Sequence, residues 1–169
     1  MPGYKIILAD DHKILREGIK SLIEKDPSFK VVGQAQNGEE LLTLLKKIRC
    51  DLIVLDLSMP QMDGIATLKK VHHQFPKIKI LILTMQKDIE HFKHAMAGGA
   101  FGYLLKEDAY DQLLLAIKVA LKGKRFISPT LEHFLTEQYV RSLDEGQESS
   151  PNILTKREFQ ILKLVAQGL

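Results

Sequence analysis

Leu52-Ile53-Val54-Leu55-Asp56 is the stretch that decides the fold, because four aliphatic side chains lead directly into a carboxylate. A continuous aliphatic run of this kind is typical of a strand in a parallel sheet that is covered on both faces. An acid at the tip of a buried strand contributes nothing to packing, so Asp56 is a candidate functional residue. A second apolar run, from Tyr4 to Ala9, ends in the same way with Asp10 and Asp11.

These three carboxylates are expected to meet. If both runs are parallel strands of one sheet, Asp10, Asp11 and Asp56 converge at its carboxyl edge. Like charges at close range need a cation between them or a raised pKa. A hard divalent cation with oxygen ligands, Mg²⁺ above all, is the natural occupant. The pattern therefore predicts an acidic magnesium site.

The rest of the first 122 residues alternates apolar runs with amphipathic segments. The expected strands are Lys5–Ala9, Lys30–Ala35, Leu52–Leu57, Lys79–Thr84 and Gly102–Leu105. The expected helices between and after them are His12–Lys25, Glu39–Ile48, Asp63–Gln74, Asp88–Ala97 and Ala109–Leu121. Asn37, Asp63, Asp88 and Asp108 are plausible N-caps for four of these helices. Five β-α units in a row predict an α/β fold with a doubly wound, five-stranded parallel sheet.

Two further polar residues fall at the carboxyl ends of expected strands, where such sheets bind their ligands. They are Thr84 and Lys106. Singly, each has an ordinary explanation as a strand threonine or a surface lysine, just as Asp10, Asp11 or Asp56 alone could cap a helix or a turn. Their joint position at one edge favours a site in which a carboxylate accepts a phosphoryl group and cations neutralise the phosphoryl oxygens.

Length and composition limit the classes of protein to which this chain could belong. A chain of 169 residues has room for one core of ordinary size and something small. No apolar run approaches the ~20 residues of a membrane span, and the start lacks a signal peptide, so a cytoplasmic protein is expected. The single Cys50 excludes an internal disulfide and a cysteine-rich metal site. The net charge of +3 is too small to indicate nucleic-acid binding by itself.

Three parts are expected along the chain: a domain over 1–125, a linker over 126–152 and the start of a second domain over 153–169. The linker is predicted to begin with a helix that follows Ser128 and ends near Ser142, and then to become polar. Thr155 and Glu158 form a predicted capping box for a final amphipathic helix. Its apolar face has little remaining chain to cover it, so association with a neighbouring molecule is one expectation.

The combined motif resembles the receiver domain of bacterial response regulators over roughly residues 4–122. The residues that carry the resemblance are Asp10-Asp11, Asp56-Leu57-Ser58-Met59-Pro60, Met62-Asp63-Gly64, Thr84 and Lys106. The resemblance implies a flavodoxin-like sheet with strand order 2-1-3-4-5. It also implies that Asp56 is the phospho-acceptor, supplied by a histidine kinase. Mg²⁺ would be bound by Asp11, Asp56 and the backbone carbonyl of Ser58, with Asp10 contributing through water.

The same resemblance assigns the switch residues. Lys106 would pair with the phosphoryl group, Thr84 would hydrogen-bond it, and Tyr103 would be the aromatic residue that moves inward. A phosphorylation-dependent homodimer is implied, with no enzymatic activity beyond self-catalysed phosphotransfer and autodephosphorylation. Two alternatives stay open: a degenerate receiver that is a phosphorylation-independent interaction module, and an aspartate-nucleophile phosphatase. The phosphatase is disfavoured because Ser58, two residues after Asp56, is not an acid.

The end of the chain carries a second resemblance. Residues 154–169 resemble the opening of a LuxR-type helix-turn-helix, the output domain of the NarL/FixJ subfamily. The segments that would follow, including the recognition helix that enters the major groove, are absent, so the output domain is expected to be truncated. DNA binding is therefore expected of the full-length output domain and not of this chain.

Overall fold

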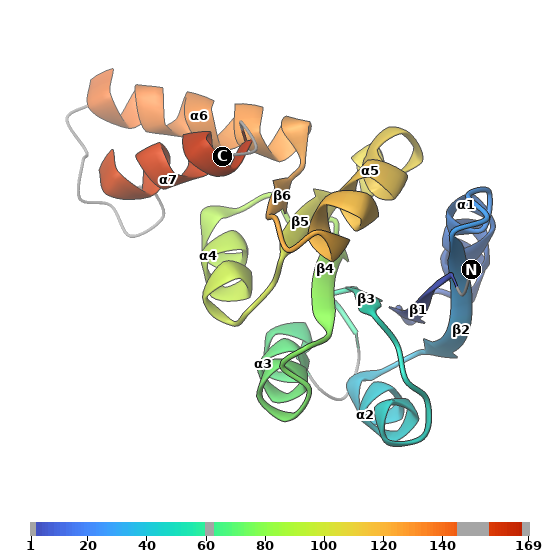
Figure 1. Ribbon diagram of the computed structural model, residues 1–169. Helices are drawn as coiled ribbons and strands as arrows, with labels where there is room; N and C mark the ends of the chain where they lie inside the picture. Colours follow the sequence, from blue (N-terminus) through green and yellow to red (C-terminus); the bar gives the residue numbers. More distant parts are fainter. Residues whose placement is uncertain (1–2, 60–62, 145–155, 167–169) are drawn as a thin grey trace.

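One parallel sheet forms the middle of the protein in the computed structural model, which describes residues 3–59, 63–144 and 156–166 (Figure 1). The strands are β1 (Tyr4–Ala9), β2 (Phe29–Ala35), β3 (Leu52–Leu55), β4 (Lys79–Thr84), β5 (Gly102–Leu105) and β6 (Phe126–Ile127). Their order across the sheet is β2-β1-β3-β4-β5-β6, and every neighbouring pair is parallel. The predicted order of the first five strands is confirmed.

The sixth strand was not predicted. Phe126 and Ile127 pair with Gly102 and Tyr103, so the sheet continues past the expected boundary at residue 125. Two residues are too few to show the alternation of side chains that is typical of a strand. This strand forms because the free edge of β5 provides backbone groups for it to pair with. The third strand also ends earlier than expected, at Leu55, although Asp56 N still donates a hydrogen bond of 2.9 Å to Ala9 O on β1.

Helices cover both faces of the sheet. They are α1 (Lys13–Ile23), α2 (Gly38–Lys47), α3 (Gly64–Gln74), α4 (Ile89–Ala97), α5 (Ala109–Leu121), α6 (Pro129–Asp144) and α7 (Lys156–Ala166), with a 3₁₀ turn, η1 (Lys106–Asp108), before α5. α1 and α5 lie on one face, and α2, α3 and α4 lie on the other (Figure 1). Within the described ranges, every helix is too short or too polar to cross a bilayer.

The alternation of side chains along β1 divides the core into two layers. Ile6 and Leu8 point into the apolar cluster that contains α1 and α5. Ile7 and Ala9 point into the cluster that contains α2, α3 and α4. Because successive residues of a strand face opposite sides, a strand buried on both faces must be apolar throughout, as the sequence pattern indicated.

Three of the four predicted N-caps are confirmed. Asn37, Asp63 and Asp88 accept hydrogen bonds from backbone N–H groups in the first turns of α2, α3 and α4. The expectation for Asp108 is wrong, because the chain is already helical there, in η1, and the side chain makes no capping bond to α5. The Asp108 carboxylate instead accepts hydrogen bonds from the hydroxyl and backbone N–H of Thr130 and from the Ser128 hydroxyl, at the start of α6.

The two last helices form a hairpin that packs beside α4 and β6 (Figure 1). The rings of Tyr139 on α6 and Phe159 on α7 stack with centroids 4.3 Å apart. Leu162 is 2% exposed and belongs to the same apolar cluster as Phe92 on α4. The chain itself thus covers this face of the final helix, contrary to the expectation that little remained to do so. Thr155, the first residue of the predicted capping box, lies outside the described residues.

Candidate functional site

The carboxyl ends of β1 and β3 bring the acidic residues together. The two strands are neighbours in the sheet, with Ala9 opposite Leu55, and the chain order reverses between them. Asp10 and Asp11 follow β1, and Asp56 follows β3. One side-chain atom from each of these residues, and one from His12, lie within 4.8 Å of one another. The predicted convergence of three carboxylates is therefore present in the fold.

Lys106 reaches this cluster from the end of β5. Its Nζ lies 3.0 Å from Oδ2 of Asp10 and 3.3 Å from Oδ2 of Asp56. All three side chains are nearly excluded from solvent, so the charges interact more strongly than they would in water. Three carboxylates and one ammonium leave an excess of two negative charges, which suits a divalent cation.

The environment of Asp56 shows the effect of that excess. The residue is 2% exposed, and burial raises the pKa of its carboxyl group. The ammonium of Lys106 and the N–H of Ser58, which donates to Asp56 Oδ1 at 3.2 Å, oppose this increase, whereas the charge of Asp10 adds to it. Asp56 is therefore a carboxylate whose ionised form needs more positive charge nearby than Lys106 alone supplies.

The residues present fit a metal with oxygen ligands. Oδ1 of Asp11 is buried and accepts no hydrogen bond from the described residues. Nδ1 of His12 lies 3.0 Å away from this oxygen but is not aligned to donate to it. A buried carboxylate oxygen without a hydrogen-bond donor is unfavourable, and a coordinated cation would satisfy it.

Thr84 and Tyr103 form a second group, next to the acidic cluster but separate from it. Thr84 is fully buried at the end of β4, and its Oγ1 accepts a hydrogen bond of 3.1 Å from Gln86 N. Tyr103 on β5 is also fully buried, and its hydroxyl donates to Gln86 O at 2.8 Å. Among the described residues, neither hydroxyl bonds to the carboxylates. The backbone of Gln86 instead joins the two residues.

The aromatic ring of Tyr103 extends this connection to a helix. It meets the ring of Phe92 on α4 edge to face, with centroids 5.5 Å apart. Burial raises the pKa of the Tyr103 hydroxyl, so it stays protonated and able to donate to Gln86. Thr84, Tyr103 and α4 are thus linked by direct contacts.

Sequence reasoning missed three residues around the site. Arg16 on α1 donates to the backbone carbonyl of Asp10 at 2.6 Å and to Oε1 of Gln34 at 3.0 Å, and so fixes the turn after β1. His12 lies beside two carboxylates and could have been found from its place next to Asp11. Gln86 acts through its backbone, so its side-chain type carries no signal.

The fold and the acidic edge define a class: a flavodoxin-like α/β protein with a cluster of carboxylates at its topological switch point. Residues 6–118 match the response regulator receiver domain family. Over 177 residues the chain is 33% identical to the transcriptional regulatory protein DegU of Brevibacillus brevis, covering 97% of this chain and 75% of that protein. It is 36% identical to the oxygen regulatory protein NreC of Staphylococcus epidermidis, covering 97% and 78% of the two chains.

Solved structures of response regulators support the same family assignment. A two-component response regulator of the LuxR family from Aurantimonas sp. SI85-9A1 aligns with a TM-score of 0.77 and 33% identity over 82% of this chain and 99% of that one. RcsB from Salmonella typhimurium aligns with a TM-score of 0.77 and 28% identity over 100% and 79%. The chain therefore belongs to the response regulator receiver family and is a two-component response regulator, as the sequence motifs indicated.

Proposed function

We propose that Asp56 accepts a phosphoryl group from a histidine kinase and that this modification switches the surface of the receiver domain. The observation that carries the proposal is the burial of Asp56 at the end of β3 with Lys106 Nζ only 3.3 Å from its Oδ2. A buried acid that is costly to ionise has little structural value. A carboxylate beside a lysine is, however, well suited to attack phosphorus.

The reaction requires no general base. A carboxylate oxygen of Asp56 attacks the phosphorus of the kinase phosphohistidine, the P–N bond breaks, and its electron pair stays on the imidazole. The product is an acyl phosphate on Asp56. Lys106 would balance the charge of the phosphoryl oxygens, and the Thr84 hydroxyl would donate to one of them. For that donation Thr84 must approach the phosphoryl group, which would disturb its present bond to Gln86 N.

We further propose that Asp10, Asp11, Asp56 and the backbone carbonyl of Ser58 hold Mg²⁺, with Asp10 acting through water. When bound, the ion supplies positive charge to the phosphoryl oxygens during transfer. The unsatisfied Oδ1 of Asp11 and the two excess negative charges of the cluster support this assignment. The chain then needs no catalytic activity toward other substrates, and its chemistry is confined to its own phosphorylation and dephosphorylation.

The consequence of phosphorylation would be a change in partner. Movement of Thr84 would reach Tyr103 through Gln86, and α4 through the contact of Tyr103 with Phe92. Since α7 and β6 already pack beside α4, the face of α1 and α5 is the better candidate for a homodimer. Ile14 on α1 is 90% exposed, and Tyr110 and Leu115 on α5 are exposed as well. The output would be transcriptional control in the cytoplasm, through a DNA-binding domain of the LuxR type.

Mass spectrometry of the intact protein tests the central step. Incubation with acetyl phosphate and Mg²⁺ should add one phosphoryl group to the wild type and none to Asp56→Ala. Asp111→Ala, which removes an exposed acid on α5, should label like the wild type. Absence of label in the wild type would favour the phosphorylation-independent interaction module, and rapid turnover of acetyl phosphate without accumulated label would favour a phosphatase.

A further inference from the structure

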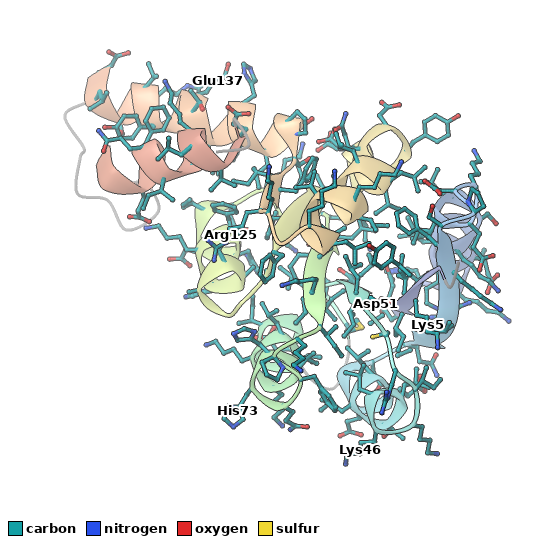
Figure 2. The ribbon with its side chains drawn as sticks, viewed as in Figure 1. Lys5, Lys46, Asp51, His73, Arg125 and Glu137 are labelled. Carbon is teal, nitrogen blue, oxygen red and sulfur yellow. The ribbon has the colours of Figure 1, made fainter. Side chains whose placement is uncertain are left out.

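A basic pocket lies at the end of the sheet opposite the acidic cluster. It is formed where β1 and β3 begin and where α2 and α3 end, and its volume is about 810 Å³. The length of β1 separates it from Asp10 by about 17 Å, at ~3.3 Å for each residue of a strand. In Figure 2, Lys5 and Asp51 label the starts of β1 and β3, and Lys46 extends from the end of α2.

The charge of this pocket is strongly positive. The basic side chains that line it, all exposed, are Lys5, Lys46, Lys47, Arg49 and Lys77. None of them forms an ion pair within the part of the chain that the structure describes. The acid in the lining is Asp51, and its Oδ2 accepts a hydrogen bond of 2.7 Å from Lys5 N, so it is engaged with the backbone.

Stabilisation of helix ends does not account for this number of cations. A helix C-terminus carries roughly half a negative charge, so α2 and α3 together offset about one positive charge. Five cations less one carboxylate and this offset leave about three positive charges around one pocket. Such an excess repels itself and is best relieved by an anionic ligand.

The floor of the pocket is apolar. Ile48, Phe75 and Ile78 are partly buried there, and Tyr4 presents a half-exposed aromatic ring at the start of β1. An apolar floor inside a cationic rim suits a molecule with a flat, weakly polar body and several negative charges. The volume falls within the roughly 300–1,000 Å³ of small-molecule sites.

We propose that this pocket binds a nucleoside di- or triphosphate. The phosphate groups would lie on the cationic rim, with Arg49 able to contact two oxygens of one phosphate, and the base would lie against Phe75 and Tyr4. The ligand would reach the protein at the end remote from Asp56, so binding and phosphorylation would occupy different surfaces. The inference is independent of the function proposed for Asp56.

Calorimetric titration with ATP, at low salt and with EDTA present, tests the proposal. EDTA removes divalent ions that could bridge the nucleotide to the acidic cluster. The variant Lys46→Gln/Arg49→Gln should bind ATP about tenfold more weakly, since it loses two charged contacts to phosphate. The matched control is Lys122→Gln/Lys124→Gln, which removes two exposed cations after α5, at the same end of the sheet but outside the pocket, and should bind like the wild type. Circular dichroism establishes that both variants are folded.

Tripolyphosphate serves as the second probe. It should bind more weakly than ATP, because it cannot use the apolar floor. Equal affinity for the two probes would overturn the assignment of a nucleotide, as would equal losses in the two double variants or no binding of ATP at all. Binding of a single-stranded oligonucleotide in place of ATP would also overturn it, because the surface would then serve a macromolecule.

Discussion

At the scale of single residues, the site is defined by an imbalance of charge around Asp56. Lys106 is shared between Asp10 and Asp56, with its Nζ 3.0 and 3.3 Å from their oxygens. Burial raises the pKa of the Asp56 carboxyl group, and the ammonium of Lys106, which is shared with Asp10, only partly opposes this increase. The fold thus maintains a buried negative charge that a bound cation, a modification of Asp56 or its protonation would relieve, and such charges are common at functional sites.

The first prediction is that Asp56→Asn stabilises the protein when divalent cations are absent. The amide removes one buried negative charge while keeping the shape of the side chain. The melting temperature at neutral pH should rise by about 2 °C or more, the shift that a change near 1 kcal/mol produces in a protein of this size. Asp111→Asn, at an exposed position, should melt like the wild type. A lower melting temperature for Asp56→Asn than for the wild type would contradict the imbalance of charge around Asp56.

The difference in stability between Asp56→Asn and the wild type should depend on pH, and the direction of this dependence follows from the pKa of Asp56. A folded-state pKa above the ordinary value of 3.8 means that the folded protein holds the Asp56 proton more tightly than the unfolded chain does. Stability from this group therefore falls as pH rises through the window between the two pKa values. The stability difference between Asp56→Asn and the wild type should grow as the pH rises above 3.8 and should close as the pH falls toward 3.8. A stability difference that increases as the pH is lowered would contradict a raised pKa of Asp56.

At the scale of elements, the loop after β4 links the end of that strand to the neighbouring strand β5. The backbone N–H of Gln86 donates to Thr84 Oγ1, and its carbonyl oxygen accepts a hydrogen bond from the Tyr103 hydroxyl, so this one residue links Thr84 on β4 to Tyr103 on β5. The ring of Tyr103 then packs on Phe92 of α4. The displacement of Thr84 that we propose would reach this helix through two hydrogen bonds and one aromatic contact.

Tyr103→Phe is predicted to weaken this connection while retaining the ring. The variant leaves Gln86 O without its donor in a partly buried position, which should lower the free energy of unfolding by about 1 kcal/mol. Phosphorylation should then change hydrogen exchange in α4 less than it does in the wild type. The control is Tyr110→Phe, whose side chain is 78% exposed on α5. Identical behaviour of the two variants would show that the Tyr103 hydroxyl transmits nothing.

Asp108 anchors α6 to the turn that follows Lys106. Its carboxylate accepts from the hydroxyl of Thr130 at 2.8 Å, from the N–H of Thr130 at 3.3 Å, and from the Ser128 hydroxyl. It thus performs the role of an N-cap for α6 from a distant part of the chain. Asp108→Ala should weaken the first turn of α6 by about 1–2 kcal/mol, as the loss of a cap does.

Hydrogen exchange measured by mass spectrometry checks this prediction. Amides in the first turn of α6 should exchange faster in Asp108→Ala, while those of β1 and β3 keep their protection. Asp111→Ala removes an acid from the first turn of α5 and should leave α6 unchanged. Unchanged exchange in α6 of the Asp108→Ala variant would mean that the apolar contacts of the helix suffice to hold it.

At the scale of the whole molecule, local signals determined what could be predicted. Continuous apolar runs identified the first five strands, and their ends identified Asp10, Asp56 and Lys106, because strand direction places those residues at one edge. The strand at Phe126 and Ile127 could not be predicted, since it depends on pairing with β5. The hydrogen-bond partners of Thr84 and Tyr103 could not be predicted either. Both side chains bond to the backbone of Gln86, and a backbone contact does not depend on the residue type in the sequence.

The packing of α7 beside α4 leads to the last prediction, which concerns the association of distant parts of the chain. Leu162 is 2% exposed among apolar residues of α4, β6 and α6, and Lys93 Nζ of α4 lies 2.8 Å from Glu158 Oε2. A partly exposed ion pair of this kind contributes about 1 kcal/mol, whereas truncating a buried leucine costs about 2–5 kcal/mol, so Leu162 should dominate the docking of α7. Leu162→Ala should therefore release α7, seen as rapid exchange of its amides, while the melting of the sheet changes little. Leu164→Ala, at a position 51% exposed on the same helix, should retain wild-type exchange. If both variants behaved alike, the apolar contact would not be what holds α7 against the receiver domain.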